Sequence, residues 1–310
     1  MPIELADIGS FHAGGRRHRI DGEPTADIAI APGLTLPHDP NGDYLIESCY
    51  VQYFIPARPT GEPCLLIHGG GLSGTCWETT PDGRPGWVSL LLEAGRPVYV
   101  ADMMERGRAG WCSLPGVWSG PTILRHAQEA WWLFRFGLAG DYDARKAFDG
   151  QRFPVDALEG FMKQAVPRWV TNTEAAARAF DAALERIGPC TVITHSSGGI
   201  HGYRLAFAHP QRVRRLVSLE PSTFPPEVPA SLQGQRFLQL MGDFLEQCPM
   251  WLDLETRTQA WSRRLADAGA TSECLRLADA GLPGHSHMMM MDHGNERVLE
   301  HVLGWLDAAD

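Results

Sequence analysis

Residues 191–199 read TVITHSSGG, and this stretch decides the fold. Residues 191–194 predict a short buried strand, and the two glycines at its end allow a tight turn into a helix. A serine at such a turn exposes its hydroxyl above the sheet, where helical N–H groups can face a developing oxyanion. We therefore predict Ser196 as a nucleophile. Ser197 is the rival, but centring the motif on it would put His195 where a small residue is needed.

Two features leave the motif open when it is taken alone. Thr194 is bulkier than the glycine usual in G-x-S-x-G, and a glycine pair after a strand can also mark a phosphate loop or a plain helix start.

A second glycine motif strengthens the interpretation. Residues 64–67 read CLLI, an apolar strand, and they lead directly into His68, Gly69, Gly70 and Gly71. HGGG after a strand is typical of a loop whose backbone N–H groups hold an oxyanion, the second donor being the N–H after the nucleophile. We assign these donors to Gly70 and Ser197, and expect Gly71 to contact substrate. One such donor is worth about 3 kcal/mol of barrier.

A base is expected near the C-terminal end, where residues 284–292 read GHSHMMMMD. His285, His287 and His293 compete for the role. An HxH pair could instead bind zinc with Asp292 and His293, but no second ligand cluster or C-x-x-C pair completes such a site. The four methionines suit a soft apolar wall beside the histidine.

Two carboxylates could orient that base. Glu220 follows an apolar strand that includes Val217 and Leu219, and Asp243 follows the next apolar run, which ends at Met241. Glu220 ranks first because it directly follows its strand and precedes Pro221. The acid must hold the imidazole tautomer and stabilise its cation.

The chain resembles the α/β-hydrolase superfamily, and within it a group of bacterial serine esterases. The resemblance rests on residues 68–87 (HGGGLSGTCWETTPDGRPGW), 194–199 (THSSGG), 218–221 (SLEP) and 284–292. It implies a triad of Ser196, Glu220 and His287, in the chain order that this fold uses. The implied fold is a mostly parallel doubly wound sheet in one domain, residues 1–310.

Residues 111–170 interrupt the regular alternation of strands and helices and are rich in tryptophan and phenylalanine. We interpret them as a helical cap over the active site, with Trp131 and Trp132 as candidates to line an apolar substrate cleft. The alternative is an ordinary satellite core. Several arginines could meet a substrate carboxylate or simply brace loops: Arg84, Arg106, Arg108, Arg125 and Arg135. After the cap, Thr171 and Glu174 predict a capping box for a helix.

Composition narrows the class of protein. The 310 residues carry 37 acidic against 27 Lys and Arg side chains, a net charge of −10, which argues against nucleic acid and anionic membranes as partners. Residues 1–24 hold no apolar run of signal-peptide length, so we expect a cytoplasmic protein. The seven scattered cysteines suggest reduced thiols. No cofactor is expected, and a homodimer is compatible with the sequence.

The sequence thus predicts a serine hydrolase that cleaves a small-molecule carboxylic ester through an acyl-enzyme. A lactonase or a carbon–carbon bond hydrolase could use the same triad. A non-catalytic ligand receptor of this fold would be expected to have lost part of the triad.

Overall fold

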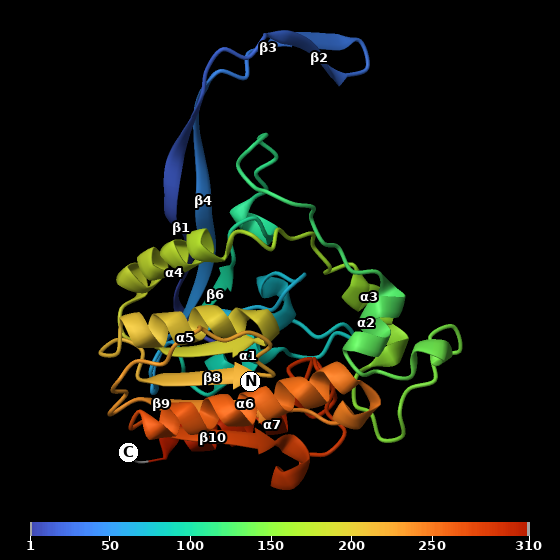
Figure 1. Cartoon of the computed structure of the whole chain (residues 1–310), viewed down its shortest axis with the longest axis vertical. Helices are drawn as coiled ribbons and strands as arrows, with labels where there is room; N and C mark the ends of the chain where they lie inside the picture. The colour runs from blue at the N-terminus through green and yellow to red at the C-terminus, as the bar shows by residue number, and fades with distance from the viewer. Residues whose placement is uncertain (1, 309–310) are drawn as a thin grey trace.

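An eight-stranded sheet forms the centre of the molecule (Figure 1). The structure, a computed structural model, describes residues 2–308. Six neighbouring strands run parallel, and β1 and β4 add an antiparallel edge. In spatial order the strands are β1 (Leu5–Ile20), β4 (Gly42–Pro56), β6 (Val98–Asp102), β5 (Cys64–Ile67), β7 (Thr191–His195), β8 (Arg215–Leu219), β9 (Arg236–Met241) and β10 (Thr271–Arg276).

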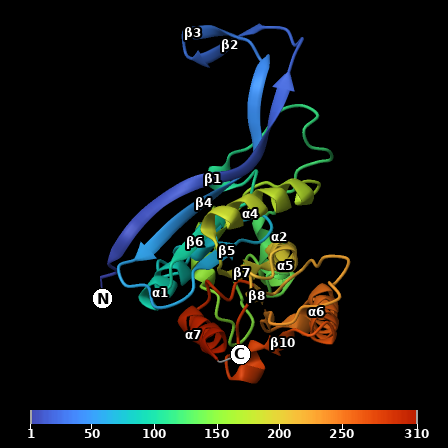
Figure 2. The same ribbon diagram turned by 90° about the vertical axis from the view of Figure 1, so that its left-hand side faces the viewer.

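Helices cover both faces of this sheet (Figure 2). On one face, α1 (Trp87–Glu93) and α7 (Asn295–Asp307) pack on alternate strand residues such as Leu66 and Ile193. The opposite face is covered by α4 (Thr173–Ile187), α5 (Gly199–Ala208) and α6 (Pro249–Asp267). These helices pack on the strand residues that point the other way, such as Leu65 and Val192. Burial on both faces explains why the parallel strands read as continuous apolar runs. The predicted doubly wound α/β class is confirmed.

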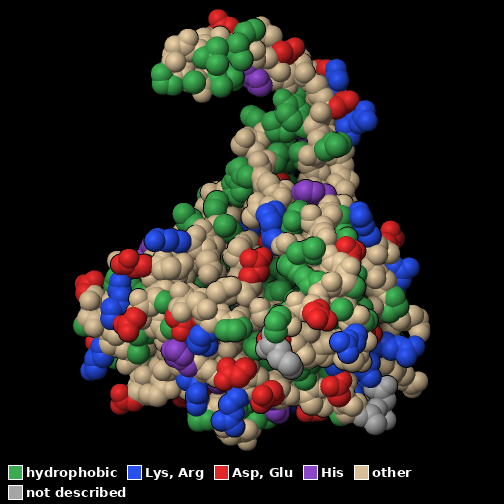
Figure 3. Space-filling model, turned by 180° about the vertical axis from the view of Figure 1, so that it is seen from behind, with side chains coloured by type: hydrophobic (Ala, Val, Ile, Leu, Met, Phe, Trp, Pro, Cys, Tyr) green, Lys and Arg blue, Asp and Glu red, His purple; other side chains and the backbone are tan. Residues whose placement is uncertain are grey.

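The antiparallel edge extends beyond the body of the molecule. β4 pairs with β1 in antiparallel register along its length. The two strands continue outward as an arm (Figure 1). The arm ends in a small hairpin of β2 (Ala26–Ala31) and β3 (Leu34–His38), whose residues are all exposed. Ile28, Ile30, Leu34 and Leu36 give this tip its apolar character, visible from behind in Figure 3.

The segment between β6 and α4 contains the aromatic-rich insertion. It forms α2 (Ala127–Leu133) and α3 (Leu158–Met162) with short 3₁₀ turns and loops around them. Many of its aromatic side chains belong to the same buried cluster as α1, α7 and the sheet. This part of the insertion is therefore continuous with the main core.

The predicted capping box at the end of the insertion is wrong. α4 begins at Thr173, and its N-cap, Asn172, makes no side-chain capping bond. The Thr171 hydroxyl donates to the Ser119 carbonyl (3.0 Å), and Glu174 pairs with Arg204 on α5. Tertiary partners outside the helix have taken both side chains that the local pattern would use. Among residues 2–308, no helix is long and apolar enough to span a bilayer.

Candidate active site

Ser196 sits at the sharp turn between β7 and α5, as the sequence predicts. Its φ is +52°, a left-handed conformation that a non-glycine residue adopts at a cost of order 1–3 kcal/mol. Seven non-glycine residues in the described chain have positive φ, and Ser196, Glu220 and Arg135 are three of them. Three of the strained backbone positions therefore belong to the proposed nucleophile, to the predicted acid and to an arginine that is bound to that acid.

The oxyanion-type loop packs directly on this turn. A Cβ on Gly70 would lie 2.9 Å from the Ser197 hydroxyl, and one on Gly198 would lie 2.6 Å from the His68 carbonyl oxygen. Only glycine fits at Gly198, where the close atoms are backbone, whereas at Gly70 the close atoms belong to the side chains of Arg168 and Ser197. The buried His68 ring braces the loop, since Nδ1 lies 2.8 Å from the Gly69 carbonyl and Nε2 accepts from Met103 N–H (3.0 Å). Burial, helped by the positive charge of Arg106, lowers the pKa of His68 to about 4.

Glu220 and His287 meet in the interior. His287 Nδ1 lies 2.6 Å from Glu220 Oε2, and neither side chain is more than 2% exposed. Glu220 also accepts from Gly242 N–H (2.6 Å). Burial lowers the pKa of His287, although Glu220 opposes that shift. The ring is therefore neutral at pH 7, with its Nδ1–H donated to the carboxylate and Nε2 free to accept a proton.

Arg135 holds the carboxylate from the other side. Its Nη1 donates to Glu220 Oε2 (2.9 Å), its Nη2 donates to Oε1, and its Nε donates to the Asp243 carbonyl (2.7 Å). Burial alone would raise the pKa of Glu220, but Arg135 and the bond to His287 outweigh it and bring that pKa to about 2. Glu220 is thus ionised at any pH where the protein would work. Sequence reasoning missed this role, because it treated Arg135 as one of several possible substrate contacts.

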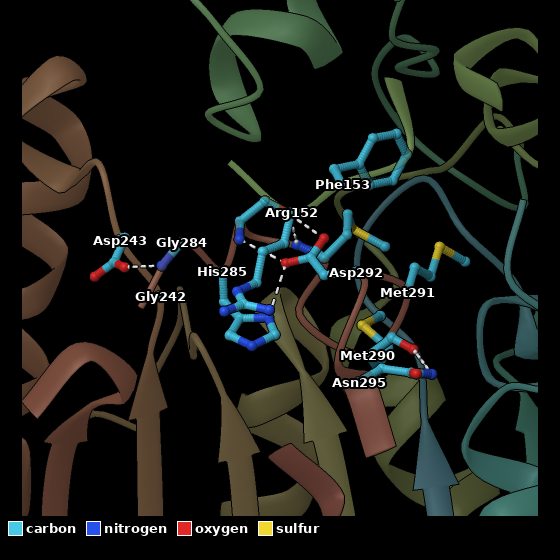
Figure 4. Close-up of polar contacts among 12 residues, drawn as sticks. Arg152, Phe153, Gly242, Asp243, Gly284, His285, Met290, Met291, Asp292 and Asn295 are labelled. Atoms are coloured by element: carbon cyan, nitrogen blue, oxygen red, sulfur yellow. Dashed lines mark hydrogen bonds and ion pairs between the residues drawn. The ribbon is translucent and has the colours of Figure 1, made fainter. Parts of the chain in front are cut away.

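The rival acid, Asp243, and one rival histidine, His285, have other partners (Figure 4). The Asp243 carboxylate accepts from Gly284 N–H, so it braces the loop that carries His287. His285 Nδ1 lies 3.2 Å from Asp292, which also binds the N–H and hydroxyl of Ser286. His293 is 57% exposed and near Asp82. Within residues 2–308, no group of three or more His, Cys, Asp or Glu could hold a metal ion.

Ser196 and His287 line one cavity of about 300 Å³. Gly70 and Ser197 also line it. No hydrogen bond joins the Ser196 hydroxyl to His287 in the described chain, and such bonds are often long in unliganded enzymes. The apolar wall comes from the insertion and α6, where Phe134 and Trp251 lie with ring centroids 5.0 and 4.3 Å from that of His287. A second buried histidine, His195, contacts the His287 carbonyl oxygen through Nε2 (3.0 Å).

The three residues that we expected to contact substrate lie outside this cavity. Trp131 is fully buried, donates to the Leu138 carbonyl (2.9 Å) and packs on Phe136. Trp132 is 36% exposed but is not part of the cavity wall. Gly71 lines a neighbouring hollow of about 20 Å³. Aromatic content alone could not separate the tryptophans of the core from the residues of the cavity wall.

Four of the five candidate arginines also lie outside the cavity wall. Arg84 binds the backbone of Met291 and Asp292, and Arg108 pairs with Asp102. Arg135 binds Glu220, and Arg106 lies buried behind the wall. Arg125 lines the cavity and pairs with Glu129. Two cavity arginines, Arg168 and Arg257, were not among the candidates.

Comparison with known proteins agrees with this architecture. No protein-family model matches the chain. It is 28% identical over 322 residues to the probable secreted lipase phiG of Fungal sp. (strain ATCC 74256), covering 86% of this chain and 87% of the lipase. A solved bacterial esterase superposes with a TM-score of 0.85 at 29% identity, covering 99% of this chain and 96% of that one. The parallel sheet, its flanking helices and this superposition show that the chain has the α/β-hydrolase fold.

Proposed function

We propose that this chain, a carboxylic ester hydrolase, cleaves its substrate through an acyl-enzyme formed on Ser196. In this proposal His287 is the general base, Glu220 orients it, and the N–H groups of Gly70 and Ser197 stabilise the oxyanion.

The first half of the reaction forms the acyl-enzyme. His287 Nε2 removes the hydroxyl proton as Ser196 Oγ attacks the ester carbonyl, and the new imidazolium is stabilised by the Glu220 carboxylate. When the tetrahedral intermediate collapses, the ester C–O bond breaks and the imidazolium returns the proton to the leaving alkoxide. Water then attacks the acyl-enzyme with the same base, which releases the carboxylic acid and restores Ser196.

One observation carries the proposal: a buried, ionised Glu220 fixes the tautomer of a neutral His287 that shares a cavity with Ser196. The strained turn at Ser196 supports it, because a left-handed non-glycine residue persists only where the surroundings enforce it. The close contact between the glycine loop and that turn supports the assignment of the two oxyanion donors.

The relatives favour ester cleavage over carbon–carbon bond cleavage, since they are described as an esterase and a lipase. We propose that Leu133, Phe134 and Trp251 contact the apolar part of the substrate. The fungal relative is described as secreted, which does not favour the cytoplasmic location predicted from the sequence.

The matched variants Ser196→Ala and Ser197→Ala test the proposal on p-nitrophenyl acetate. The first should lower kcat by a factor of about 10⁴ or more, while the second keeps its backbone N–H donor and should lose less than about tenfold. Circular dichroism and thermal unfolding verify that both variants are folded. Activity that survives in Ser196→Ala but disappears in Ser197→Ala would overturn the assignment.

A further inference from the structure

One charged side chain in the cavity wall, Arg168, makes no hydrogen bond or ion pair with the residues that the structure describes. It lines the wall beside Ser196 and is partly buried. Only the backbone of Arg168 is hydrogen-bonded: its N–H donates to the Ile123 carbonyl, and its carbonyl accepts from the Ile123 N–H. A desolvated cation without a counter-charge costs free energy unless an anion compensates it.

A second arginine, Arg106, interacts electrostatically with Arg168 and also has donors without a partner. Arg106 is 3% exposed, and its Nε and Nη1 have no hydrogen-bond partner. Burial and, to a lesser extent, the charge of Arg168 lower the pKa of Arg106 to about 9. Glu105 is the nearby carboxylate that opposes this shift, and one of its oxygens is bound to Cys112 N–H.

The balance of charge in the cavity wall is positive. Arg125, Arg168 and Arg257 are its cations, and Asp253, 3.9 Å from Arg257, is its carboxylate. Arg125 is paired with Glu129 just outside the wall. These pairs account for Arg125 and Arg257. Glu129 attracts the charge of Arg168 without forming an ion pair with it, so Arg168 is the cation of the wall that no carboxylate of the described chain contacts.

We propose that Arg168 forms an anion subsite beside the reacting carbonyl, and that the natural substrate is an ester carrying a carboxylate. This rests on the proposed function, since it places the subsite relative to Ser196. A guanidinium binds a carboxylate through two parallel hydrogen bonds, a geometry that a neutral ester cannot supply.

The position of Arg168 limits where the carboxylate lies. Its guanidinium carbon is 2.8 Å from the place that a Cβ on Gly70 would occupy, so it packs against the predicted oxyanion donor. A substrate carbonyl at Gly70 would therefore have its carboxylate only a few bonds away. Half-esters of short dicarboxylic acids fit this requirement.

Monoethyl glutarate and ethyl valerate test the subsite, because their acyl chains have the same length and only the first carries a carboxylate. Hydrolysis is followed by pH-stat. The wild-type kcat/KM should be at least about tenfold higher for monoethyl glutarate. Arg168→Gln should lower the ratio of the two kcat/KM values by about tenfold to a hundredfold, mainly through the KM of the charged ester, and Arg168→Lys should lower it less.

A matched control is Arg58→Gln, which removes a 90% exposed arginine that does not line this cavity and should leave the ratio unchanged. The subsite is overturned if wild-type enzyme prefers ethyl valerate, or if Arg168→Gln changes both esters equally.

Calorimetric titration of Ser196→Ala with glutarate separates this proposal from the proposed function, because binding needs no turnover. Binding of glutarate that Arg168→Gln weakens by tenfold or more supports the subsite even if Ser196 is not the nucleophile. Binding that is equal with and without Arg168 overturns the subsite and leaves the triad proposal intact.

Discussion

Two arginines from the 111–170 insertion flank the active-site cavity in opposite ways. Arg135 is fully buried, and each of its three guanidinium nitrogens donates to Glu220 or to the Asp243 carbonyl. Arg168 is only partly buried, faces the cavity and has no partner in the described chain. The same residue type therefore serves internal positioning at one place and is available to a ligand at the other. Pairing with protein groups, more than burial, separates the two roles.

The largest effect on kcat among these variants is expected from substituting Glu220, the partner of Arg135. Glu220→Gln should lower kcat by about 10³–10⁴-fold, because the amide cannot stabilise the imidazolium and leaves Arg135 without a counter-charge. Asp243→Asn should cost less than about tenfold, since that carboxylate binds Gly284. Steady-state kinetics on one neutral ester measure both, and a larger loss in Asp243→Asn would reverse the assignment of the acid.

The next effect is on stability. Arg135→Gln breaks a buried pair and should lower the free energy of unfolding by about 3–5 kcal/mol. Arg168→Gln should change it by less than about 1 kcal/mol, because no hydrogen bond or ion pair with the described residues is lost. Urea titration of the two variants compares them directly. Equal destabilisation would mean that Arg168 has an internal partner after all.

Two buried histidines, His68 and His201, should make the free energy of unfolding depend on pH. Burial lowers the pKa of His68 to about 4 and, with Arg204, that of His201 to about 3. The unfolded chain binds protons on these rings below about pH 6.5 while the folded state does not. Stability should therefore be constant above that pH and fall between about pH 6.5 and 3, as measured by unfolding at a series of pH values. Stability that rises on acidification would contradict this.

The smallest effect concerns the shape of the pH–rate profile. Burial lowers the pKa of His287, so the acid limb of kcat/KM for a neutral ester should have its midpoint below 6.5. Arg168→Gln should leave that midpoint in place. A midpoint above 6.5 would show that the Glu220 charge outweighs burial in the free enzyme.

The same contrast explains what could be predicted from the sequence. Ser196, Glu220 and His287 stand beside strand ends or in short motifs, so their local pattern predicts where the sheet places them. Arg135 and Arg168 lie in irregular chain, where nothing local indicates which of many arginines reaches the site. Glu220, the partner of Arg135, lies 85 residues away along the chain, and Arg168 makes no hydrogen bond or ion pair within the described residues.

Tertiary packing also explains the sequence predictions that did not match. Trp131 looks like a cleft residue from its neighbours, but contacts with Phe136 and Tyr142 bury it in the core. The tip of the arm was not predicted, although Ile28 and Ile30, and Leu34 and Leu36, alternate with other residues on either side of Pro32-Gly33. That pattern is typical of a half-buried hairpin, whereas β2 and β3 bury none of their residues.

A covalent label tests the central claim most directly. The protein is treated with a fluorophosphonate, digested, and the modified peptide is sequenced by mass spectrometry, with Glu220→Gln as a slowly reacting control. The account predicts one phosphonylated residue, Ser196, at near-stoichiometric yield. A label on Ser197 or on a serine outside the cavity, or no label on an enzyme that still hydrolyses esters, would contradict it.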